Sequence, residues 1–331
     1  MINELHLMDN QEGIAKLADK SVNLIIADPP YYKIKGDFDF EFKDFQEYLN
    51  FMEEQAKLYK RVLADNGSLF VYGHAKNIAY VQVIFDKYFN LENSLVWYKP
   101  DSRTKKGIGI YRSFAPSTER VLFYSNEIQR TGLEEIKLDV NNFKSLRNYF
   151  EQVQNFIGIS LKKINDTLGH RKAEHCFYWN STQWDLPTQE VYSQLIDKFN
   201  INKMICFREY ESLRQEYESL RRPFNNIKNY EDVISMNQEM HLYNSFDHDT
   251  IKPERLTLDL IETTTKENDL VLIPFGGSGT ECVCSMRLKR QWVAFENKKK
   301  YFDIALKRIQ SEYEKTSLFN SLGGRQLQLS A

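Results

Sequence analysis

The chain has 331 residues, of which 42% are hydrophobic and 27% are charged, as in an ordinary globular protein rather than a membrane or disordered one. No apolar run is long enough to span a membrane, and the first ten residues, MINELHLMDN, lack the basic and apolar regions of a secretory signal, so we expect a cytoplasmic protein. The four cysteines show neither metal-ligand spacing nor a disulfide framework, and the formal net charge of −2 does not decide whether nucleic acid is a partner, because binding needs only a local basic surface.

The predicted elements of residues 1–125 alternate between strands and helices. Strands are expected at 4–8, 22–27, 68–72, 94–98 and 120–124, and helices at 11–18, 42–64 and 77–88. This alternation implies a mostly parallel sheet with helices on both faces.

Farther along the chain the pattern changes and then returns. Long polar helices are expected from about 130 to 245, and after Pro253 the α/β rhythm resumes, with helices at 254–266, 279–288 and 298–314 and strands at 269–275 and 291–295. We therefore expect an α/β domain with a seven-stranded, mostly parallel sheet built from both chain ends, interrupted by a mainly helical insertion.

The insertion contains a tandem repeat, EYESLRQ (209–215) followed by EYESLRR (216–222). Its Tyr and Leu side chains fall on one face of a predicted helix that ends before Pro223. Two heptads are too few for an independent coiled coil. The simpler interpretation is a helix packed on its own domain, and the alternative is an arm that grips DNA or a partner subunit.

A glycine-rich turn follows the predicted strand at 269–275, in the sequence VLIPFGGSGTECV (271–283). Glycines there permit positive φ and a close approach of the backbone to a ligand, and the N–H groups of the helix that begins near Thr280 would point at that ligand. Glu296 ends the next predicted strand, where an acid commonly accepts hydrogen bonds from a ribose diol. No Lys-Ser or Lys-Thr follows the glycines, so the turn is not a P-loop. The two strand ends predict a nucleoside-cofactor site, although such a turn alone would be explained equally well as a simple tight turn.

A second notable turn is Asp28-Pro29-Pro30-Tyr31, which directly follows the buried strand VNLIIA (22–27). The prolines fix φ and carry no N–H, so the carbonyls of this turn are held rigidly beside a carboxylate and an aromatic ring. Ligands of open α/β sheets bind beyond the carboxyl ends of the strands, so this turn and the glycine loop can face one crevice. Two acceptors and a stacking ring suit an exocyclic amino group on a flat base. Taken alone, the turn would be interpreted as an acidic strand end before a Pro-Pro turn.

In this order along the chain, these elements resemble those of the permuted, β-group S-adenosylmethionine-dependent DNA amino-methyltransferases, which methylate adenine N6 or cytosine N4. Asp28-Pro29-Pro30-Tyr31 is similar to the catalytic tetrapeptide of that family, and NGSLF (66–70), NSLVWYKP (93–100) and STERVLFY (117–124) are similar to its later catalytic-side motifs. HDTIKP (248–253) resembles its His-x-Thr-Gln-Lys-Pro element with Ile251 in place of Gln. PFGGSGT (274–280) resembles its cofactor loop, with Ile273 in place of the usual Asp. The resemblance covers residues 1–125 and 248–314.

The resemblance implies a Rossmann-like methyltransferase fold. Residues 1–128 would form the catalytic half, 129–247 a target-recognition insertion, 248–316 the cofactor-binding half and 317–331 a flexible tail. A base flipped out of double-stranded DNA would place its amino group between the Asp28 carboxylate and the Pro29 carbonyl, with Tyr31 stacked on the base and Pro30 completing the turn.

The resemblance also implies that S-adenosyl-L-methionine is the cofactor. Asp9 would meet its adenine, Phe275 would pack on that ring, and Glu296 would bind the ribose hydroxyls. The full set of expected cofactor contacts is Asp9, Asp28, His248, Thr250, Lys252, Phe275, Gly276, Gly277, Ser278, Gly279, Thr280 and Glu296.

The type of target base follows in part from the same turn. Asp at position 28 favours adenine, because the cytosine N4 enzymes of the family more often carry Ser there. Cytosine C5 methylation is excluded, because it needs a cysteine nucleophile, usually after a proline, and no cysteine here follows a proline. Two alternatives stay open: a DNA-binding protein of the same fold that has lost transfer, given Ile273, and an enzyme that methylates RNA or a protein amide. Whether the protein forms a homodimer, or is paired with a cognate restriction endonuclease, also stays open.

Two stretches are candidate DNA contacts. KPDSRTKKGIGIYRS (99–113) predicts a phosphate-binding loop through its five basic residues, with a solvated surface loop as the alternative; these residues are Lys99, Arg103, Lys105, Lys106 and Arg112. GISLKKINDTLGHRKAEHCFYW (158–179) has the outline of a helix-turn-helix. Its second helix would bring Arg171, Lys172 and Glu174 to base edges, and an ordinary helical hairpin is the alternative.

Overall fold

The computed structural model describes residues 1–34, 39, 41–100, 114, 116–126, 143–181, 183–237 and 251–328, with side chains described up to residue 315. The chain divides into two compact units. The first comprises residues 1–129 and 222–331, and the second comprises residues 130–221. The expectation that both chain ends contribute to one domain is thereby confirmed.

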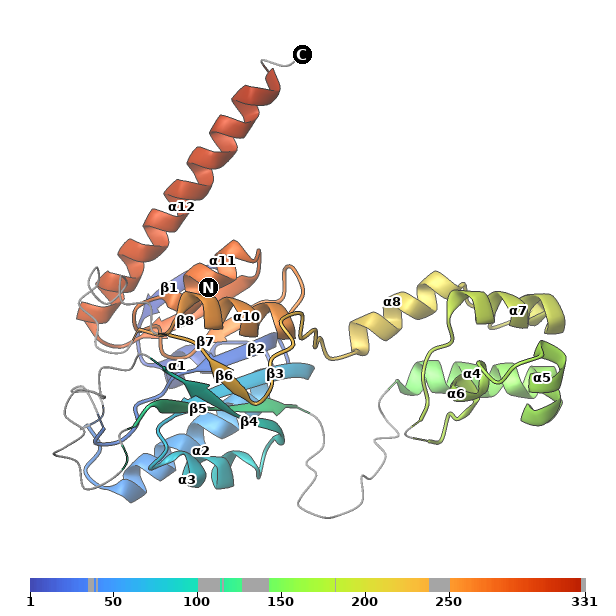
Figure 1. Ribbon diagram of the computed structural model, residues 1–331, viewed down its shortest axis with the longest axis horizontal. Coiled ribbons are helices and arrows are strands. Elements are labelled where there is room, and N and C mark those ends of the chain that lie inside the picture. Colours follow the sequence, from blue (N-terminus) through green and yellow to red (C-terminus); the bar gives the residue numbers. More distant parts are fainter. Residues whose placement is uncertain are drawn as a thin grey trace. The chain divides into compact units, whose positions relative to one another are not determined.

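The first unit contains one sheet in the order β1-β8-β7-β2-β3-β5-β4-β6 (Figure 1). Its strands are β1 (Glu4–Leu7), β2 (Val22–Ala27), β3 (Leu63–Gly73), β4 (Asn90–Tyr98), β5 (Thr118–Ser125), β6 (Val233–Ser235), β7 (Leu270–Ile273) and β8 (Gln291–Glu296). Every neighbouring pair is parallel except β3 with β5 and β5 with β4. The prediction that the strand near 270–275 lies beside the strand at 22–27 is confirmed, because β2 pairs with β7 through Leu24 with Val271 and Ile25 with Leu272.

Helices cover both faces of this sheet, so the unit has three layers (Figure 1). Successive residues of a strand point to opposite faces, and in β2 Ile25 packs in one apolar cluster while Ile26 packs in the other. The first cluster contains residues of α1 (Asn10–Ala15), α2 (Phe45–Val62) and α3 (Ile78–Phe85). The second contains residues of α10 (Glu254–Thr264), α11 (Thr280–Arg287) and α12 (Lys299–Gln328). The near-continuous apolar sequence of β2 is explained by this burial on both faces.

The sheet has eight strands in the described part of the chain, whereas the sequence predicted seven. The additional strand, β6, pairs in parallel with β4, with Val96 opposite Val233 and Tyr98 opposite Ser235. This pairing also moves the expected domain boundary. The insertion was expected to continue to residue 247, but the second unit ends at Arg221 and residues 222–237 belong to the sheet-containing unit. A strand of three residues is too short for its alternation to be recognised in a sequence.

The second unit is helical and has its own apolar core. Its elements are α4 (Lys144–Ile157), α5 (Leu161–Leu168), α6 (Glu174–Phe177), α7 (Gln189–Phe199), the 3-10 helix η4 (Ile201–Lys203) and α8 (Tyr210–Leu220). The tandem repeat forms α8, in which Leu213 is fully buried in the core and Tyr210 and Tyr217 pack against it. The repeat is therefore a helix packed on its own unit, as in the simpler interpretation.

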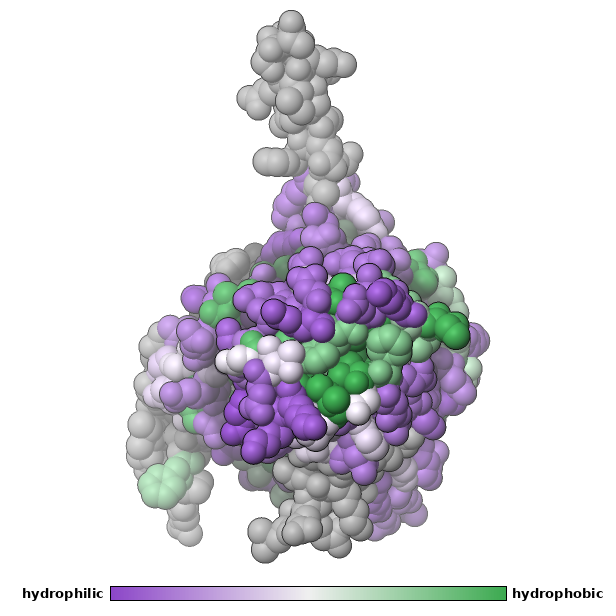
Figure 2. All heavy atoms as spheres, turned by 90° about the vertical axis from the view of Figure 1, so that its right-hand side faces the viewer, coloured by the Kyte–Doolittle hydropathy of each residue, from purple (hydrophilic) through white to green (hydrophobic). Residues whose placement is uncertain are grey.

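The end of the chain also differs from expectation. The helix expected to end at 314 continues as α12 to Gln328, so the predicted flexible tail at 317–331 is largely helical in the described residues. The face shown in Figure 2 is mostly hydrophilic, with a hydrophobic area near its centre. Within the described residues, no helix combines the length and apolar character needed to cross a bilayer.

Candidate active site

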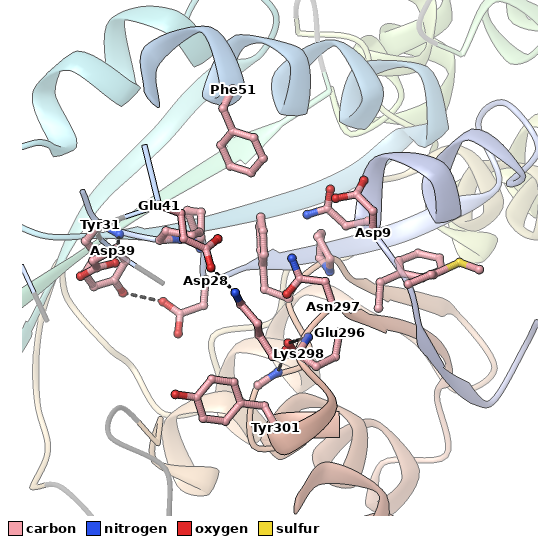
Figure 3. Close-up of a pocket in the computed structure, with 18 of the residues that line it drawn as sticks. Asp9, Asp28, Tyr31, Asp39, Glu41, Phe51, Glu296, Asn297, Lys298 and Tyr301 are labelled. Carbon is pink, nitrogen blue, oxygen red and sulfur yellow. Dashed lines mark hydrogen bonds and ion pairs between the residues drawn. The ribbon is translucent and has the colours of Figure 1, made fainter. Parts of the chain in front are cut away.

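Three parallel strands end at one edge of the sheet, and the turns that follow them line one pocket (Figure 3). The turn after β2 contributes Asp28, Pro29, Pro30 and Tyr31, the turn after β7 contributes Pro274, Phe275 and Gly277, and the end of β8 contributes Glu296. The cavity has a volume of about 250 Å³, far more than the ~30 Å³ that one water occupies in the liquid. The two turns singled out in the sequence therefore share one crevice, as predicted.

The Asp28 carboxylate is held from two sides. Its Oδ1 accepts a hydrogen bond from the Tyr31 hydroxyl at 2.5 Å, and its Oδ2 forms an ion pair with the Lys252 ammonium at 2.7 Å. The Asp28 side chain is 23% exposed and lines the pocket. Each carboxylate oxygen has two lone pairs, so Asp28 can still accept hydrogen bonds from a group in the pocket.

Tyr31 is fixed at both its backbone and its hydroxyl. Its N–H donates to Asp39 Oδ1 at 2.5 Å, and the side-chain amide of Asn77 donates to its carbonyl. Burial and the nearby Asp28 carboxylate raise the pKa of Tyr31 well above its ordinary value, so the hydroxyl stays protonated and remains a donor. The expected stacking role of the ring stays a prediction, and the structure adds a hydroxyl contact that the sequence did not indicate.

Lys252 was expected to contact the cofactor, and it does line the pocket, but its ammonium is engaged by carboxylates. Besides Asp28 it lies 3.4 Å from Glu119 Oε2, and it donates to the Tyr31 hydroxyl at 3.1 Å. Glu119 in turn forms an ion pair with Lys99 at 2.6 Å. Burial lowers the pKa of Lys252, but the two carboxylates outweigh burial and hold it above its ordinary value, so Lys252 is a cation. Sequence reasoning missed Glu119, although it lies inside the quoted segment STERVLFY.

The glycine loop is shaped by close packing. Gly276 donates its N–H to the Phe295 carbonyl at 2.6 Å, and Gly279 has φ of +76° with the site of a Cβ only 3.0 Å from the Ala305 Cβ. Only glycine adopts this φ freely, and no side chain fits against α12 at that point. Ser278 and Thr280, both predicted as cofactor contacts, are buried and do not line the pocket in the described residues. The Arg308 guanidinium donates to Ser278 Oγ at 3.1 Å and to Thr280 Oγ1 at 3.0 Å, so these side chains support the loop from behind.

Glu296 and Asp9 line the same pocket, and both also have structural partners. Glu296 accepts the N–H of Gly277 at 2.9 Å and that of Lys298 at 2.8 Å, and burial raises its pKa above the ordinary value. Asp9 is the N-cap of α1 and accepts the N–H of Gln11 at 2.8 Å. Both Glu296 and Asp9, which were expected to contact the nucleoside, therefore also hold the nearby backbone in place.

Several lining residues were missed from the sequence. The aromatic side chains of Phe42 and Phe51 lie at the pocket beside Phe275, with the Phe51 and Phe275 ring centroids 6.3 Å apart. The other missed lining residues are Met8, Asn10, Asp39, Glu41, Phe295, Asn297, Lys298 and Tyr301. Five of the ten, Met8, Asn10, Phe295, Asn297 and Lys298, lie within three residues of a predicted strand end, which is the signal that could have indicated them.

Of the predicted contacts in the basic stretch 99–113, only Lys99 lies in the described part of the chain. Lys99 was assigned to phosphate, but its side chain is only 14% exposed, its ammonium is paired with Glu119 and it lies 4.9 Å from the centre of the Trp97 ring. That assignment is therefore corrected to an internal ion pair. Arg103, Lys105, Lys106 and Arg112, and the predicted cofactor contacts His248 and Thr250, lie outside the described residues.

The predicted helix-turn-helix is wrong in its second helix. The first helix is present as α5, capped by Ser160 and ended by Gly169, but only Glu174–Phe177 is helical in the predicted recognition helix. Glu174, expected to reach base edges, instead turns inward, where its carboxylate accepts hydrogen bonds from Asn165 at 2.6 Å and Tyr178 at 3.0 Å. Arg171 pairs with the same carboxylate at 2.6 Å, and Lys172 is exposed.

The chain is similar in sequence and in fold to known DNA methyltransferases. Over 308 residues the chain is 23% identical to the type II methyltransferase M.HpaI of Haemophilus parainfluenzae, covering 91% of this chain and 72% of that protein. It is 24% identical over 322 residues to M2.DpnII of Streptococcus pneumoniae, covering 92% and 89%. Among solved structures, the cytosine-N4-specific PvuII DNA methyltransferase has a TM-score of 0.52 at 15% identity, covering 94% and 91% of the two chains, and the M1.HpyAVI-SAM complex has 0.50 at 18%, covering 92% and 98%. These two structures share the fold.

The family model described as DNA methylase matches residues 22–307, which include the Asp28 turn, the Lys252 segment, the glycine loop and Glu296. The match covers most of the chain, and the chain belongs to the DNA methylase family.

Proposed function

We propose that this protein is a site-specific DNA methyltransferase that transfers the methyl group of S-adenosyl-L-methionine to the exocyclic N6 of adenine in double-stranded DNA. The observation that carries the proposal is the single pocket that joins the Asp28 turn, the glycine loop and Glu296. The order of these elements supports assignment to the permuted β-group, because the Asp28 turn precedes the helical unit and the glycine loop follows it. The type II methyltransferases among the relatives support a role beside a restriction endonuclease.

The residues of the pocket fit the proposed cofactor. Glu296 keeps free lone pairs after accepting two backbone N–H groups, so it can accept hydrogen bonds from a ribose diol. Phe275 and Phe51 provide apolar faces for a flat ring, and Asp9 provides an acceptor beside them. When bound, the cofactor supplies a methyl group carried on a positively charged sulfur.

Asp28 and the rigid turn act on the target base. The amino nitrogen of adenine is a poor nucleophile because its lone pair is delocalised into the ring. Hydrogen bonds from the amino group to the Asp28 carboxylate and the Pro29 carbonyl favour a pyramidal nitrogen with a localised lone pair. With the cofactor bound, the nitrogen–carbon bond would form as the carbon–sulfur bond breaks, the sulfur would leave as a neutral thioether, and the methylated nitrogen would release a proton to the Asp28 carboxylate or to water. No covalent intermediate with the protein is needed, and Asp28 need not be a strong base.

Methylation of cytosine N4 is the second candidate, because the same two acceptors suit its amino group and the matching family model carries both N6 and N4 in its name. Asp28 favours adenine through the family pattern. The alternative of a binding protein without transfer rested on Ile273. That residue is fully buried in the second apolar cluster and is not among the described pocket-lining residues, so its identity leaves the Asp28 side of the pocket complete.

The helical unit of residues 130–221 is the proposed target reader, because it stands as a separate compact unit inserted into the domain that holds the pocket. Lys172 is exposed and free to approach DNA, whereas Glu174 is held inside the unit. Changing Lys172 to Ala should relax sequence preference at particular positions if it reads bases, and should weaken binding to all sequences equally if it contacts phosphate.

Methylation-sensitive sequencing of DNA from cells that express the protein tests the proposal. We expect N6-methyladenine at one recurring sequence in cells with the wild-type protein, and none in cells with the Asp28→Ala variant at matched expression. Methylated cytosine in place of adenine would assign the second candidate. Unmodified DNA in both would refute the proposed function.

A further inference from the structure

Four charged side chains from four segments form a continuous row beside the pocket. Asp28 follows β2, Lys252 precedes α10, Glu119 lies in β5 and Lys99 follows β4. The successive nitrogen–oxygen distances are 2.7 Å, 3.4 Å and 2.6 Å. All four side chains are at least three-quarters shielded from solvent, and Lys252 is only 3% exposed.

We propose that Lys252 and Glu119 are positioning residues for methyl transfer: Lys252 orients the Asp28 carboxylate toward the target amino group, and Glu119 holds Lys252 in place. The inference rests on the proposed function of Asp28 and adds to it two residues that do not touch the reacting atoms.

Three oxygens surround the Lys252 ammonium. Its Nζ forms ion pairs with Asp28 Oδ2 at 2.7 Å and Glu119 Oε2 at 3.4 Å, and it donates a hydrogen bond to the Tyr31 hydroxyl at 3.1 Å. The Tyr31 hydroxyl donates a hydrogen bond to Asp28 Oδ1. The carboxylate is therefore fixed through both oxygens, and the lone pairs that remain are presented to the pocket in a defined orientation.

Charge balance explains why the row needs all its members. Two carboxylates and two ammonium groups cancel, so no net charge is buried. A buried charge that loses its partner is strongly disfavoured. Without Lys252, Asp28 and Glu119 would face each other without the ammonium between them, and one of them would take up a proton near neutral pH. A protonated Asp28 has an O–H donor where the amino group needs an acceptor.

Other titratable groups interact with the row. They are Tyr31, Tyr72, Glu281 and His74, with Arg308 near Glu281. Glu281 is the one that could imitate the effect of Asp28 in a pH profile, because burial raises its pKa to about 7. The variant Glu281→Gln removes that titration and leaves the row intact, so it serves as the matched control.

The test compares single-turnover methyl transfer at pH 5.5 to 9 in Lys252→Met, Glu119→Gln, the double variant and Lys252→Arg. We expect Lys252→Met to shift the acidic limb of the rate profile upward by ~1 pH unit or more, which corresponds to about tenfold in rate below the new pKa. Glu119→Gln should shift the limb downward, because Asp28 then has the ammonium to itself. On the acidic limb the double variant should be about tenfold or more faster than Lys252→Met, because removing the Glu119 charge restores charge balance. Lys252→Arg should keep the wild-type limb.

A second readout needs neither DNA nor cofactor, so it separates this inference from the proposed function. Burial raises the pKa of the Glu119 carboxyl, but Lys252 and Lys99 outweigh burial and lower this pKa below its ordinary value. The ionised Glu119 therefore stabilises the folded protein above pH ~4.5, and this contribution is lost as the pH falls through the pKa of Glu119 in the folded protein. In Lys252→Met the buried carboxylates should instead have raised pKa values. The gap in melting temperature between the wild type and Lys252→Met should therefore widen from pH 5 to pH 8.

A constant gap across that range, with an unshifted acidic limb in the variants that fold, would overturn the inference and leave Lys252 as a packing residue. If Lys252→Met does not fold, the Glu119→Gln limb and the double variant decide in the same way. If the wild type transfers no methyl group to any DNA but the gap still widens, the ionic row stands and the proposed function fails.

Discussion

Replacing Tyr31 with Phe removes one hydroxyl and keeps the ring, and it separates two roles that the site gives to this residue. The hydroxyl donates to Asp28 Oδ1 at 2.5 Å and accepts from Lys252 at 3.1 Å. A hydrogen bond to a charged group contributes roughly 1.5–3 kcal/mol, and 1.4 kcal/mol is a factor of ten. If the bond orients Asp28 in the transition state, the variant should transfer methyl roughly 10- to 100-fold more slowly.

The companion variants Tyr31→Trp and Tyr31→Ala complete the series. Trp keeps a stacking face without the hydroxyl, so we expect a rate close to that of Phe. Ala also loses stacking, which contributes about 1–3 kcal/mol per base, so it should be slower than Phe by another factor of roughly ten or more. The assay is single-turnover transfer of a labelled methyl group to a duplex that carries the target site, with cofactor affinity measured by calorimetry as the control.

The order of the four rates decides the question. A Phe variant as fast as the wild type would show that the Tyr31–Asp28 hydrogen bond does not contribute to transfer. A Phe variant no faster than the Ala variant would show that the pocket does not use the ring of this residue as a stacking surface.

Three further outcomes are expected. Asp28→Ala should abolish transfer while calorimetry shows cofactor affinity within about threefold of the wild type, since a loss of ~0.7 kcal/mol or less is expected for a residue that acts on the base; near-normal transfer would remove Asp28 from the mechanism. Glu296→Gln should weaken cofactor binding about tenfold or more, because hydrogen bonds to a charged acceptor are replaced by weaker ones, and unchanged affinity would place the ribose elsewhere. Gly279→Ala should lower the midpoint of urea unfolding more than Gly169→Ala. Both glycines have φ near +75°, but a Cβ on Gly279 would lie 3.0 Å from Ala305, whereas one on Gly169 would meet nothing within 4 Å. Equal decreases in the midpoint would mean that α12 moves to accommodate the new Cβ at no cost in stability.

The sequence was most informative where the types of a few neighbouring residues determine the local backbone structure. The apolar run before Asp28 predicted β2, and the glycines after Ile273 predicted the tight turn into α11; both features are present. The adjacency of β2 and β7 followed from the need of two turns to share one crevice, although the strands are almost 250 residues apart in sequence.

Contacts between distant side chains were beyond prediction from one sequence. Lys252 was recognised as a site residue, but its ion pairs depend on where β5 places Glu119, and no local pattern encodes that distance. Lys99 looked like a phosphate contact because neighbouring residues are basic, and only the fold brings Glu119 to it. The role predicted for Glu174 failed for a similar reason, because only the fold brings Asn165 and Tyr178 to its carboxylate and holds it inside the helical unit.

Mass spectrometry of the nucleosides from DNA treated with the purified protein and S-adenosyl-L-methionine tests the central claim most directly. The account predicts N6-methyldeoxyadenosine with the wild-type protein and none with Asp28→Ala. N4-methyldeoxycytidine alone would contradict the assignment to adenine, and 5-methyldeoxycytidine, or no methylated nucleoside from any duplex, would contradict the mechanism built on Asp28.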